Sequence, residues 1–245
     1  MSSEDAEGYA QRVAESIKAD VRMFSGCKDS QTSADVQDVS TFGLPEADGA
    51  GGACTNAMLL TLSDEHSDSW LGLLKGMHSV LATKEFTQIP QLSTSRQVDV
   101  NDKFSLQNTE SEGGNHKCLM IGINYIGQQG ELAGCHNDVD AMMEYITTHG
   151  YSGDEGNCMI LKDDDVNNAP TAEGILAGFS WLVADAQPGD SLFMHYSGHG
   201  GNIHDSSGDE ADNRDETMCP VDYATAGQIT DDMILEKLVM PSPRE

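Results

Sequence analysis

Residues 191–201 read Ser191-Leu192-Phe193-Met194-His195-Tyr196-Ser197-Gly198-His199-Gly200-Gly201. The apolar start predicts a buried strand over Ser191–Met194, and the glycines after it predict a turn that carries His199. Open α/β sheets bind their ligands just past the carboxyl ends of strands. Flanking glycines let backbone N–H groups approach a substrate closely, and a histidine can take and return a proton near neutral pH. The stretch therefore predicts a catalytic histidine, although no nucleophile stands beside it.

The sequence around this stretch predicts alternating strands and helices. Strands are expected over 118–123, 158–161 and 191–194, separated by one helix that ends near Gly150 and another that begins at Pro170. Apolar residues at helical spacing line both helices: Val139, Met142, Met143 and Ile146 in the first, and Ile175, Leu176, Phe179, Leu182 and Val183 in the second. Elements of these lengths indicate βαβ units and a mostly parallel sheet. A further helix is expected over 231–239, before Pro241.

The first half of the chain is less regular. We expect a short helix over 3–20, a strand over 21–24 and a helix over 54–62. A second helix is indicated by apolar residues at helical spacing, which are Trp70, Leu73, Leu74, Met77 and Leu81. Residues 103–106 are expected to form a short strand. The polar composition of residues 107–116 is typical of a linker.

The charge balance restricts the partners. The 245 residues include 13 basic and 41 acidic side chains, a net charge of −28. Such an excess of negative charge argues against nucleic acid or an anionic membrane as partner. It favours cationic substrates or divalent cations, or provides only a well-solvated surface.

Compartment and thiol state follow from simple patterns. No apolar signal segment follows Met1 and no run of 18 apolar residues occurs, so we expect a soluble, cytoplasmic protein. The six cysteines form no Cys-x-x-Cys pair and are expected to be thiols. Cys118 and Cys158 fall inside the predicted strands, where a thiol packs as a small hydrophobe.

Two acidic features precede or follow the histidine turn. Asp138 stands at a predicted helix start, where it either caps the helix or lines a pocket for a basic side chain. Residues 205–216 are expected to form a loop, whose six carboxylates are Asp205, Asp209, Glu210, Asp212, Asp215 and Glu216. Crowded carboxylates are stable when solvated or when they hold a hard cation. The EF-hand spacing is absent, and zinc is not expected without clustered thiols and imidazoles.

A nucleophile is harder to find. Ser197 does not lie in a Gly-x-Ser-x-Gly elbow. Cys219 is the cysteine nearest to His199 in sequence, but Pro220 follows it, and Cys135 projects from the same end of the predicted sheet. Either thiol would need thiolate character and contact with His199 to act. Both remain candidates on sequence grounds.

Taken together, these segments resemble those of a metacaspase, a caspase-fold cysteine peptidase. The segments that carry the resemblance occur in order: Gly122-Ile123-Asn124-Tyr125, Leu132-Ala133-Gly134-Cys135-His136-Asn137-Asp138, His195 to Gly201, Asp215-Glu216-Thr217-Met218-Cys219-Pro220-Val221-Asp222, and Ile229-Thr230-Asp231-Asp232. The resemblance implies a caspase-like three-layer α/β/α sandwich with a mostly parallel central sheet.

The resemblance also implies roles for individual residues. His199 would be the catalytic histidine, and the Gly200 N–H would help to bind the oxyanion. Cys135, Asp138 and Ser197 would line the pocket for an Arg or Lys at P1. Calcium would be bound by Asp215, Asp231 and Asp232.

The first half resembles the small-subunit segment of the family. The matching segments are 24–35, Gly52-Ala53-Cys54-Thr55 and 90–95. This segment precedes the catalytic one here, as in the rearranged type III group, with its strands expected to pair at one edge of the sheet. We therefore expect an N-terminal helical extension over 1–20, a small-subunit-like segment over 21–106, a linker over 107–116 and a catalytic-subunit-like segment over 117–245.

The family nucleophile lies in Asp-Cys-Cys-His-Ser-Gly or a close variant. The family spacing places this motif roughly ten residues beyond Glu245, so we expect the sequence to be truncated and the sheet incomplete at its C-terminus. The leading hypothesis is a calcium-dependent cysteine endopeptidase that cleaves protein or peptide substrates after Arg or Lys and is a monomer. The alternative is a catalytically inactive caspase-like domain that binds partners or calcium. A calcium-binding protein without catalytic ancestry would leave the His199 motif unexplained.

Overall fold

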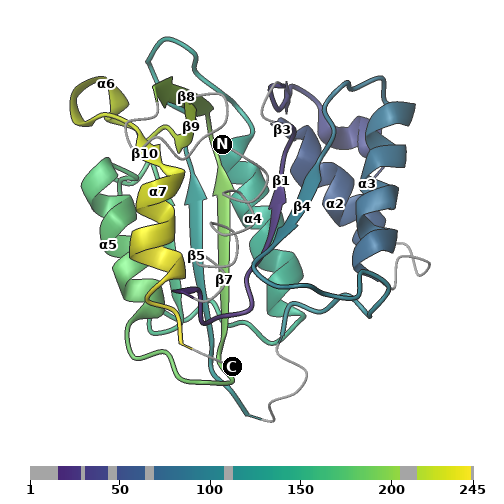
Figure 1. Ribbon diagram of the computed structural model, residues 1–245. Helices are drawn as coiled ribbons and strands as arrows, with labels where there is room; N and C mark the ends of the chain where they lie inside the picture. The colour runs from purple at the N-terminus through teal and green to yellow at the C-terminus, as the bar shows by residue number, and fades with distance from the viewer. Residues whose placement is uncertain are drawn as a thin grey trace.

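A three-stranded parallel sheet forms the centre of the computed structural model, which describes residues 16–28, 31–43, 49–63, 69–107, 113–204 and 214–243. Strand β5 (His116–Gly122) lies between β6 (Cys158–Lys162) and β7 (Ser191–Ser197), and both neighbours run parallel to it (Figure 1). The three predicted strands and their direction are confirmed. Strand β7 continues to Ser197, so its carboxyl end lies two residues before His199.

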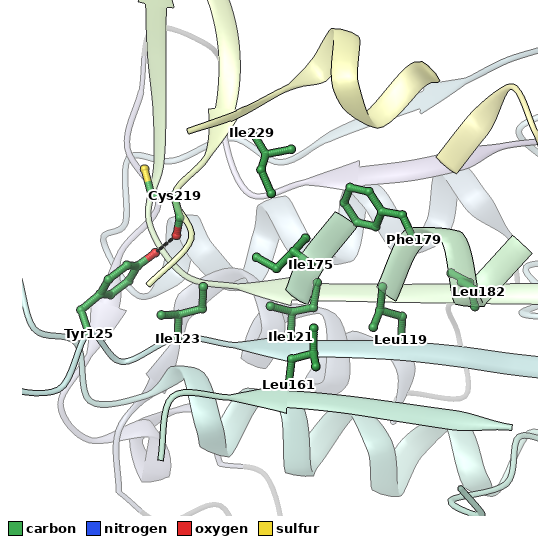
Figure 2. Close-up of a cluster of buried hydrophobic side chains, with 10 residues drawn as sticks. All are labelled: Leu119, Ile121, Ile123, Tyr125, Leu161, Ile175, Phe179, Leu182, Cys219 and Ile229. Atoms are coloured by element: carbon green, nitrogen blue, oxygen red, sulfur yellow. Dashed lines mark hydrogen bonds between the residues drawn. The ribbon is translucent and has the colours of Figure 1, made fainter. Parts of the chain in front are cut away.

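Side chains that alternate along β5 fill the two faces of the sheet. Leu119 and Ile121 pack against α5 (Ala172–Val183), where Phe179 is fully buried (Figure 2). The intervening Cys118 and Met120 pack against α4 (Cys135–Thr147) on the opposite face. A buried sheet with helices on both faces requires apolar residues at every position of its central strand. The predicted α/β sandwich around a parallel sheet is confirmed.

Helix α5 begins at a different residue from the Pro170 that the sequence predicted. Helix α5 begins after Thr171, whose hydroxyl accepts a hydrogen bond from the N–H of Gly174 at 3.0 Å. Pro170 therefore precedes the cap and does not begin the helix. Helix α7 (Asp231–Ile234) continues as a π-helical segment, η2 (Leu235–Val239), which packs on α5. The helix predicted over 231–239 is confirmed, with this change of helix type in its second half.

A second sheet follows the histidine turn and was not predicted. Strand β8 (Gly200–His204) pairs antiparallel with β9 (Arg214–Met218), and β9 pairs with the short β10 (Ile229–Thr230). Gly200 and Gly201 thus lie in a strand, and residues 214–216 of the predicted loop belong to β9 instead. Glycines and acidic residues are depleted in strands, so their sequence pattern hid this hairpin. Asp205, Asp209, Glu210 and Asp212 lie outside the described residues.

The first half forms a smaller helical layer. Helices α2 (Ala53–Leu62) and α3 (Trp70–Thr83) pack together around Ala57, Leu73 and Met77, as their spacing predicted. A short 3-10 helix, η1 (Val39–Phe42), adds two side chains to this core.

Helix α6 (Tyr223–Ala226) is a single turn in the second half.

The strands of the first half do not join the central sheet in the described residues. Strand β1 (Arg22–Ser25) pairs with β4 (Gln91–Thr94), and β2 (Asp35–Val36) pairs with β3 (Gly51–Gly52). The expected pairing at the edge of the main sheet is therefore wrong for these strands. The strand predicted over 103–106 is also wrong, because Phe104 packs edge-on against Trp70 instead and only Lys103 forms an isolated bridge.

The two halves meet through α4. Helix α2 and strand β3 contact α4, beside the central sheet (Figure 1). Gly134 and Gly51 pack closely at this contact, where a methyl group on Gly134 would overlap the Cα and N atoms of Gly51 and lie 2.6 Å from an oxygen of Asp35. Glycine at position 134 is therefore required by packing between the halves.

Some predictions concern residues at the ends of the described ranges. Most of the helix predicted over 3–20 lies outside them; Ser16 is helical and residues 17–20 are irregular. The predicted segment boundaries, including the linker, stay predictions. All six cysteines are free thiols, as expected, and Cys118 faces Cys158 across the β5–β6 pair. Across the ranges listed above, no helix combines the length and apolar character needed to cross a membrane.

Replacing Gly134 with Ala is expected to lower the free energy of unfolding by roughly 1–3 kcal/mol, because the added methyl group meets backbone atoms that cannot move aside. Gly156→Ala is the matched control, since a methyl group at Gly156 would meet no atom within 4 Å. Urea unfolding of both variants measures the difference. Equal losses in the two variants would contradict the close approach of the halves at Gly134.

Candidate active site

The carboxylate of Asp138 joins three elements at the carboxyl end of β7. It is 2% exposed and projects from the first turn of α4. Its two oxygens accept hydrogen bonds from the N–H of Gly52 at 2.8 and 2.9 Å, and Oδ2 also accepts one from Ser197 Oγ at 2.6 Å. Gly134 is the N-cap of α4, and the first N–H of the helix, that of Cys135, donates to Oδ1 of Asn124 at 2.9 Å. Of the two roles open to Asp138, capping is therefore excluded.

Burial gives the Asp138 carboxylate an unusual proton affinity. Desolvation raises its pKa from 3.8 to about 6, although the hydrogen bonds from Ser197 and Gly52 lower it and the charge of Asp35 adds to the rise. At neutral pH the carboxylate is ionised and incompletely compensated. A buried anion of this kind is stabilised by a cation that can form charge-assisted hydrogen bonds to it.

Cys135 lies beside this carboxylate as a neutral thiol. Burial raises the pKa of Cys135 to about 12, against a lowering by the hydrogen bond with Ser197. The charges of Asp138 and Asp35 raise it further. The structure thus brings together Cys135, Asp138 and Ser197, the three residues expected to line one pocket.

Asp35 belongs to the same cluster and was not assigned a role from the sequence. It comes from β2, in the first half of the chain, and its Oδ2 accepts a hydrogen bond from the N–H of Ala133 at 3.0 Å. Asp35 stands about a hundred residues before α4 and carries no local signal beyond its place in the family-like segment. Only the docking of β2 and β3 against α4 reveals it.

His199 follows β7 as predicted, and its ring is held by Gly130. The Nε2 atom lies 2.6 Å from the carbonyl oxygen of Gly130. A carbonyl only accepts hydrogen bonds, so Nε2 is assigned the proton and Nδ1 of the neutral ring is the basic nitrogen. The ring of Tyr125 lies 4.7 Å from the imidazole. Gly200 is exposed next to His199, at the start of β8.

The turn that supplies Tyr125 is held by a second carboxylate. Asp163 accepts hydrogen bonds from the N–H groups of Asn124 at 2.8 Å and Ile126 at 3.1 Å, and it lies 2.6 Å from Nε2 of His136. Burial raises the pKa of Asp163, but these hydrogen bonds outweigh it and the net shift is a lowering. Tyr125 has φ = 53°, a left-handed conformation that bulky residues rarely adopt. Asp163 thus binds the backbone on both sides of Tyr125 and stabilises this conformation. We call this pair of hydrogen bonds, to Asn124 and Ile126, the Asp163 clamp.

Neither cysteine candidate has the properties of a nucleophile. Cys135 and Cys219 are both buried, and burial raises the pKa of each thiol. The N–H of Cys219 donates to the His199 carbonyl at 3.0 Å, so its backbone lies beside the turn. The Nε2 atom of the His199 ring contacts the carbonyl oxygen of Gly130 rather than either of these thiols. Both thiols therefore resist ionisation and are poor nucleophiles in these positions.

The acidic residues predicted to bind calcium are neighbours. Asp215 lies in β9 and is 5% exposed, and Asp231 and Asp232 begin α7 just after β10, which pairs with β9. Burial raises the pKa of Asp231, and the charges of Asp232 and Asp215 add to the rise. Carboxylate oxygens suit a hard cation such as calcium. Within the described ranges, however, no three such side chains are gathered closely enough to hold a metal ion.

Comparison with known proteins now identifies the class. Residues 116–245 match the family described as "Metacaspase, peptidase C14 domain". The chain therefore belongs to the metacaspase family of cysteine peptidases. It is 44% identical over 244 residues to Metacaspase III c of Phaeodactylum tricornutum, an alignment that covers 96% of this chain and 72% of that protein. The resemblance to the type III group, with the small segment first, is confirmed by this alignment.

Other relatives match about half of the chain. Metacaspase-1 of Mycosarcoma maydis is 48% identical over 132 residues, which cover 53% of this chain and 32% of that protein. The chain thus spans about a third of that relative. The crystal structure of protein GSU0716 from Geobacter sulfurreducens shows a partial likeness, with a TM-score of 0.41 and 27% identity over 51% of this chain and 45% of that one.

Replacing Asp138 with Asn is expected to flatten the pH dependence of stability between pH 4 and 7. Because the folded-state pKa of about 6 lies above the ordinary 3.8, the protonated carboxyl stabilises the fold, fully below pH 3.8, and this contribution is lost as the pH rises through 6. The shift corresponds to roughly 3 kcal/mol. Asn cannot ionise, so the variant is expected to gain stability relative to the parent chain by about this amount across the range.

Thermal unfolding at stepwise pH measures this effect. Asp140→Asn is the matched control, since Asp140 also lies on α4 but is exposed and pairs with Lys162 at the surface. The groups that face Asp138 and carry charge or titrate are Asp35, Cys135 and Cys54, and both variants retain them. Parallel pH profiles for the parent and Asp138→Asn would contradict the buried, raised carboxylate.

Proposed function

We propose that this chain supplies the histidine and the specificity pocket of an endopeptidase that hydrolyses peptide bonds after Arg or Lys. The observation that supports this proposal is the buried Asp138 carboxylate. It accepts hydrogen bonds from the N–H of Gly52 and from the hydroxyl of Ser197, which lies two residues before His199. A guanidinium or ammonium group would add the positive charge that the neutral donors Gly52 and Ser197 do not supply. A neutral or acidic P1 side chain would leave the carboxylate uncompensated.

The remaining pocket residues favour the same substrate. Ser197 orients the carboxylate through its hydroxyl. The Cys135 thiol is uncharged, so it lies beside the carboxylate without adding a charge of its own. Asp35 adds a second negative charge near the pocket. Two carboxylates at one site favour the binding of a cation over any neutral group.

His199 acts in this proposal as general base and then general acid. Nδ1 takes the proton of a cysteine thiol, the thiolate attacks the substrate carbonyl carbon, and Nδ1–H returns the proton to the leaving amine. Water then hydrolyses the thioester. The Gly200 N–H is proposed to donate to the oxyanion of the tetrahedral intermediate. The nucleophile is proposed to come from the family's Asp-Cys-Cys-His-Ser-Gly motif, outside these 245 residues.

Calcium is the proposed metal ion of the protein. Asp215, Asp231 and Asp232 would contribute oxygen ligands. Burial is the main cause of the raised pKa of Asp231, and bound calcium would relieve the repulsion from Asp232 and Asp215 that adds to it. We further propose that the protein is a cytoplasmic monomer whose partners are protein or peptide substrates with a basic P1 residue. The alternative function is an inactive caspase-like binding domain, which is favoured by the raised pKa values of the thiols of Cys135 and Cys219.

A chain extended past Glu245 through the Asp-Cys-Cys-His-Ser-Gly motif is expected to cleave fluorogenic peptides with Arg at P1. His199→Ala should lower kcat/KM by about 10²–10⁴-fold through loss of the base. Asp138→Asn should lower it about 10²-fold through loss of the buried charge pair. His149→Ala, at the exposed end of α4, is the matched control and should retain activity.

The assay separates the two functions. Cleavage of an Arg substrate but not of a Gln substrate of the same length supports the proposed specificity. An extended chain that remains silent with millimolar calcium, while folded by circular dichroism, supports the inactive domain and rejects the peptidase.

Isothermal titration is expected to detect calcium binding to the chain and its loss in the double variant Asp231→Ala, Asp232→Ala. The control variant is Asp140→Ala, Asp164→Ala, which removes two exposed carboxylates elsewhere and the same charge. Equal calcium binding by the two double variants would remove Asp231 and Asp232 from the ligand set.

A further inference from the structure

Two tyrosines bind the backbone of the His199 turn from opposite directions. Tyr125, which is fully buried, accepts a hydrogen bond from the N–H of His199 at 2.9 Å. Tyr196, three residues before His199, donates its hydroxyl proton to the His199 carbonyl at 2.7 Å. Both polar groups of the His199 backbone are therefore bound by phenols.

The same two phenols also bind Cys219, in the reverse sense. Tyr125 donates its proton to the Cys219 carbonyl at 2.6 Å (Figure 2), and Tyr196 accepts from the Cys219 N–H at 3.2 Å. Each hydroxyl thus accepts from one residue and donates to the other, which uses its single proton and one lone pair. His199 and Cys219 also share a direct backbone hydrogen bond of 3.0 Å. The two residues are therefore connected through Tyr125, through Tyr196 and directly.

The Tyr125 ring completes the arrangement. Its centroid lies 4.7 Å from that of the His199 imidazole, with 33° between the ring planes. Contact on this face, together with the bond from Nε2 to Gly130, restricts rotation of the imidazole. Burial raises the pKa of both phenols, so both stay protonated and keep their donor roles.

We propose that Tyr125 and Tyr196 are positioning residues that hold the backbone and ring of His199 so that Nε2–H faces Gly130 and Nδ1 is presented for proton transfer. The inference rests on the proposed function, which makes His199 the base. The Asp163 clamp on Asn124 and Ile126 extends the same arrangement, because it holds Tyr125 in its left-handed conformation.

Nuclear magnetic resonance of the chain tests the proposal without any peptidase activity. The variants are Tyr125→Phe and Tyr196→Phe, and the matched control is Tyr151→Phe. Tyr151 is also buried and its hydroxyl donates to a backbone carbonyl, that of Leu106, at 2.8 Å, but it lies at the other end of the sheet. Ring ¹⁵N shifts report the His199 tautomer, and amide exchange reports its backbone.

We expect a single Nε2–H tautomer in the parent chain and in Tyr151→Phe. In Tyr125→Phe and Tyr196→Phe the ring signals should move toward a mixture of tautomers, and the His199 amide should exchange about tenfold faster than in Tyr151→Phe. Unchanged His199 signals in both variants would overturn the proposal. Tyr196→Phe keeps the hydrogen bonds of Tyr125 to His199 and Cys219, so it serves if Tyr125→Phe fails to fold. A parent chain with the proton on Nδ1 would overturn it without any variant.

Activity of the extended chain separates this inference from the proposed function. Positioning predicts that Tyr125→Phe lowers kcat about tenfold or more with KM unchanged, whereas the pocket variant Asp138→Asn raises KM. A silent parent enzyme with the expected His199 signals would reject the peptidase and leave the positioning intact. An active parent enzyme with unaffected tyrosine variants would reject the positioning alone.

Discussion

The hydrogen bonds that Asp138 accepts from Gly52 and Ser197 are the constraint on which the rest of the site depends. They connect α4 to the carboxyl end of β7 in the main sheet and to the two-residue strand β3, 86 positions earlier. Moving any one of the three elements would leave a buried carboxylate without its donors, at a cost of several kcal/mol. The position of the first half is thereby coupled to the chemistry of the second.

Small residues make this coupling possible. A methyl group on Gly52 would lie 2.5 Å from Asp138 Oδ2, and one on Gly134 would overlap the Gly51 backbone. Glycines at the meeting point let β3 approach α4 closely enough for a backbone N–H to reach a side chain. The fold accepts a buried charge there, which is destabilising at neutral pH, at the place where we propose that the substrate cation binds.

The sequence pattern predicted the main sheet, its two flanking helices and the position of His199. Strong periodicity in β5, α4 and α5 explains this, because each buries a continuous apolar face. The pattern failed at β8 and β9, where glycines and carboxylates conceal a hairpin, and at Phe104, whose contact is with Trp70 rather than a neighbouring strand. It also passed over Asp35, Gly130 and Tyr125, since their hydrogen-bond partners lie far away along the chain.

By itself, the sequence determined the family, the order of the two halves, the parallel sheet and the histidine at its carboxyl edge, because these depend on local motifs and on periodicity. The tertiary structure alone decided that Asp138 binds Gly52 and Ser197 instead of capping its helix, and that Gly130 and Tyr125 hold the His199 ring. Hydrogen bonds and desolvation depend on distances between segments separated by tens of residues. Such distances are set by packing, and no local pattern encodes them.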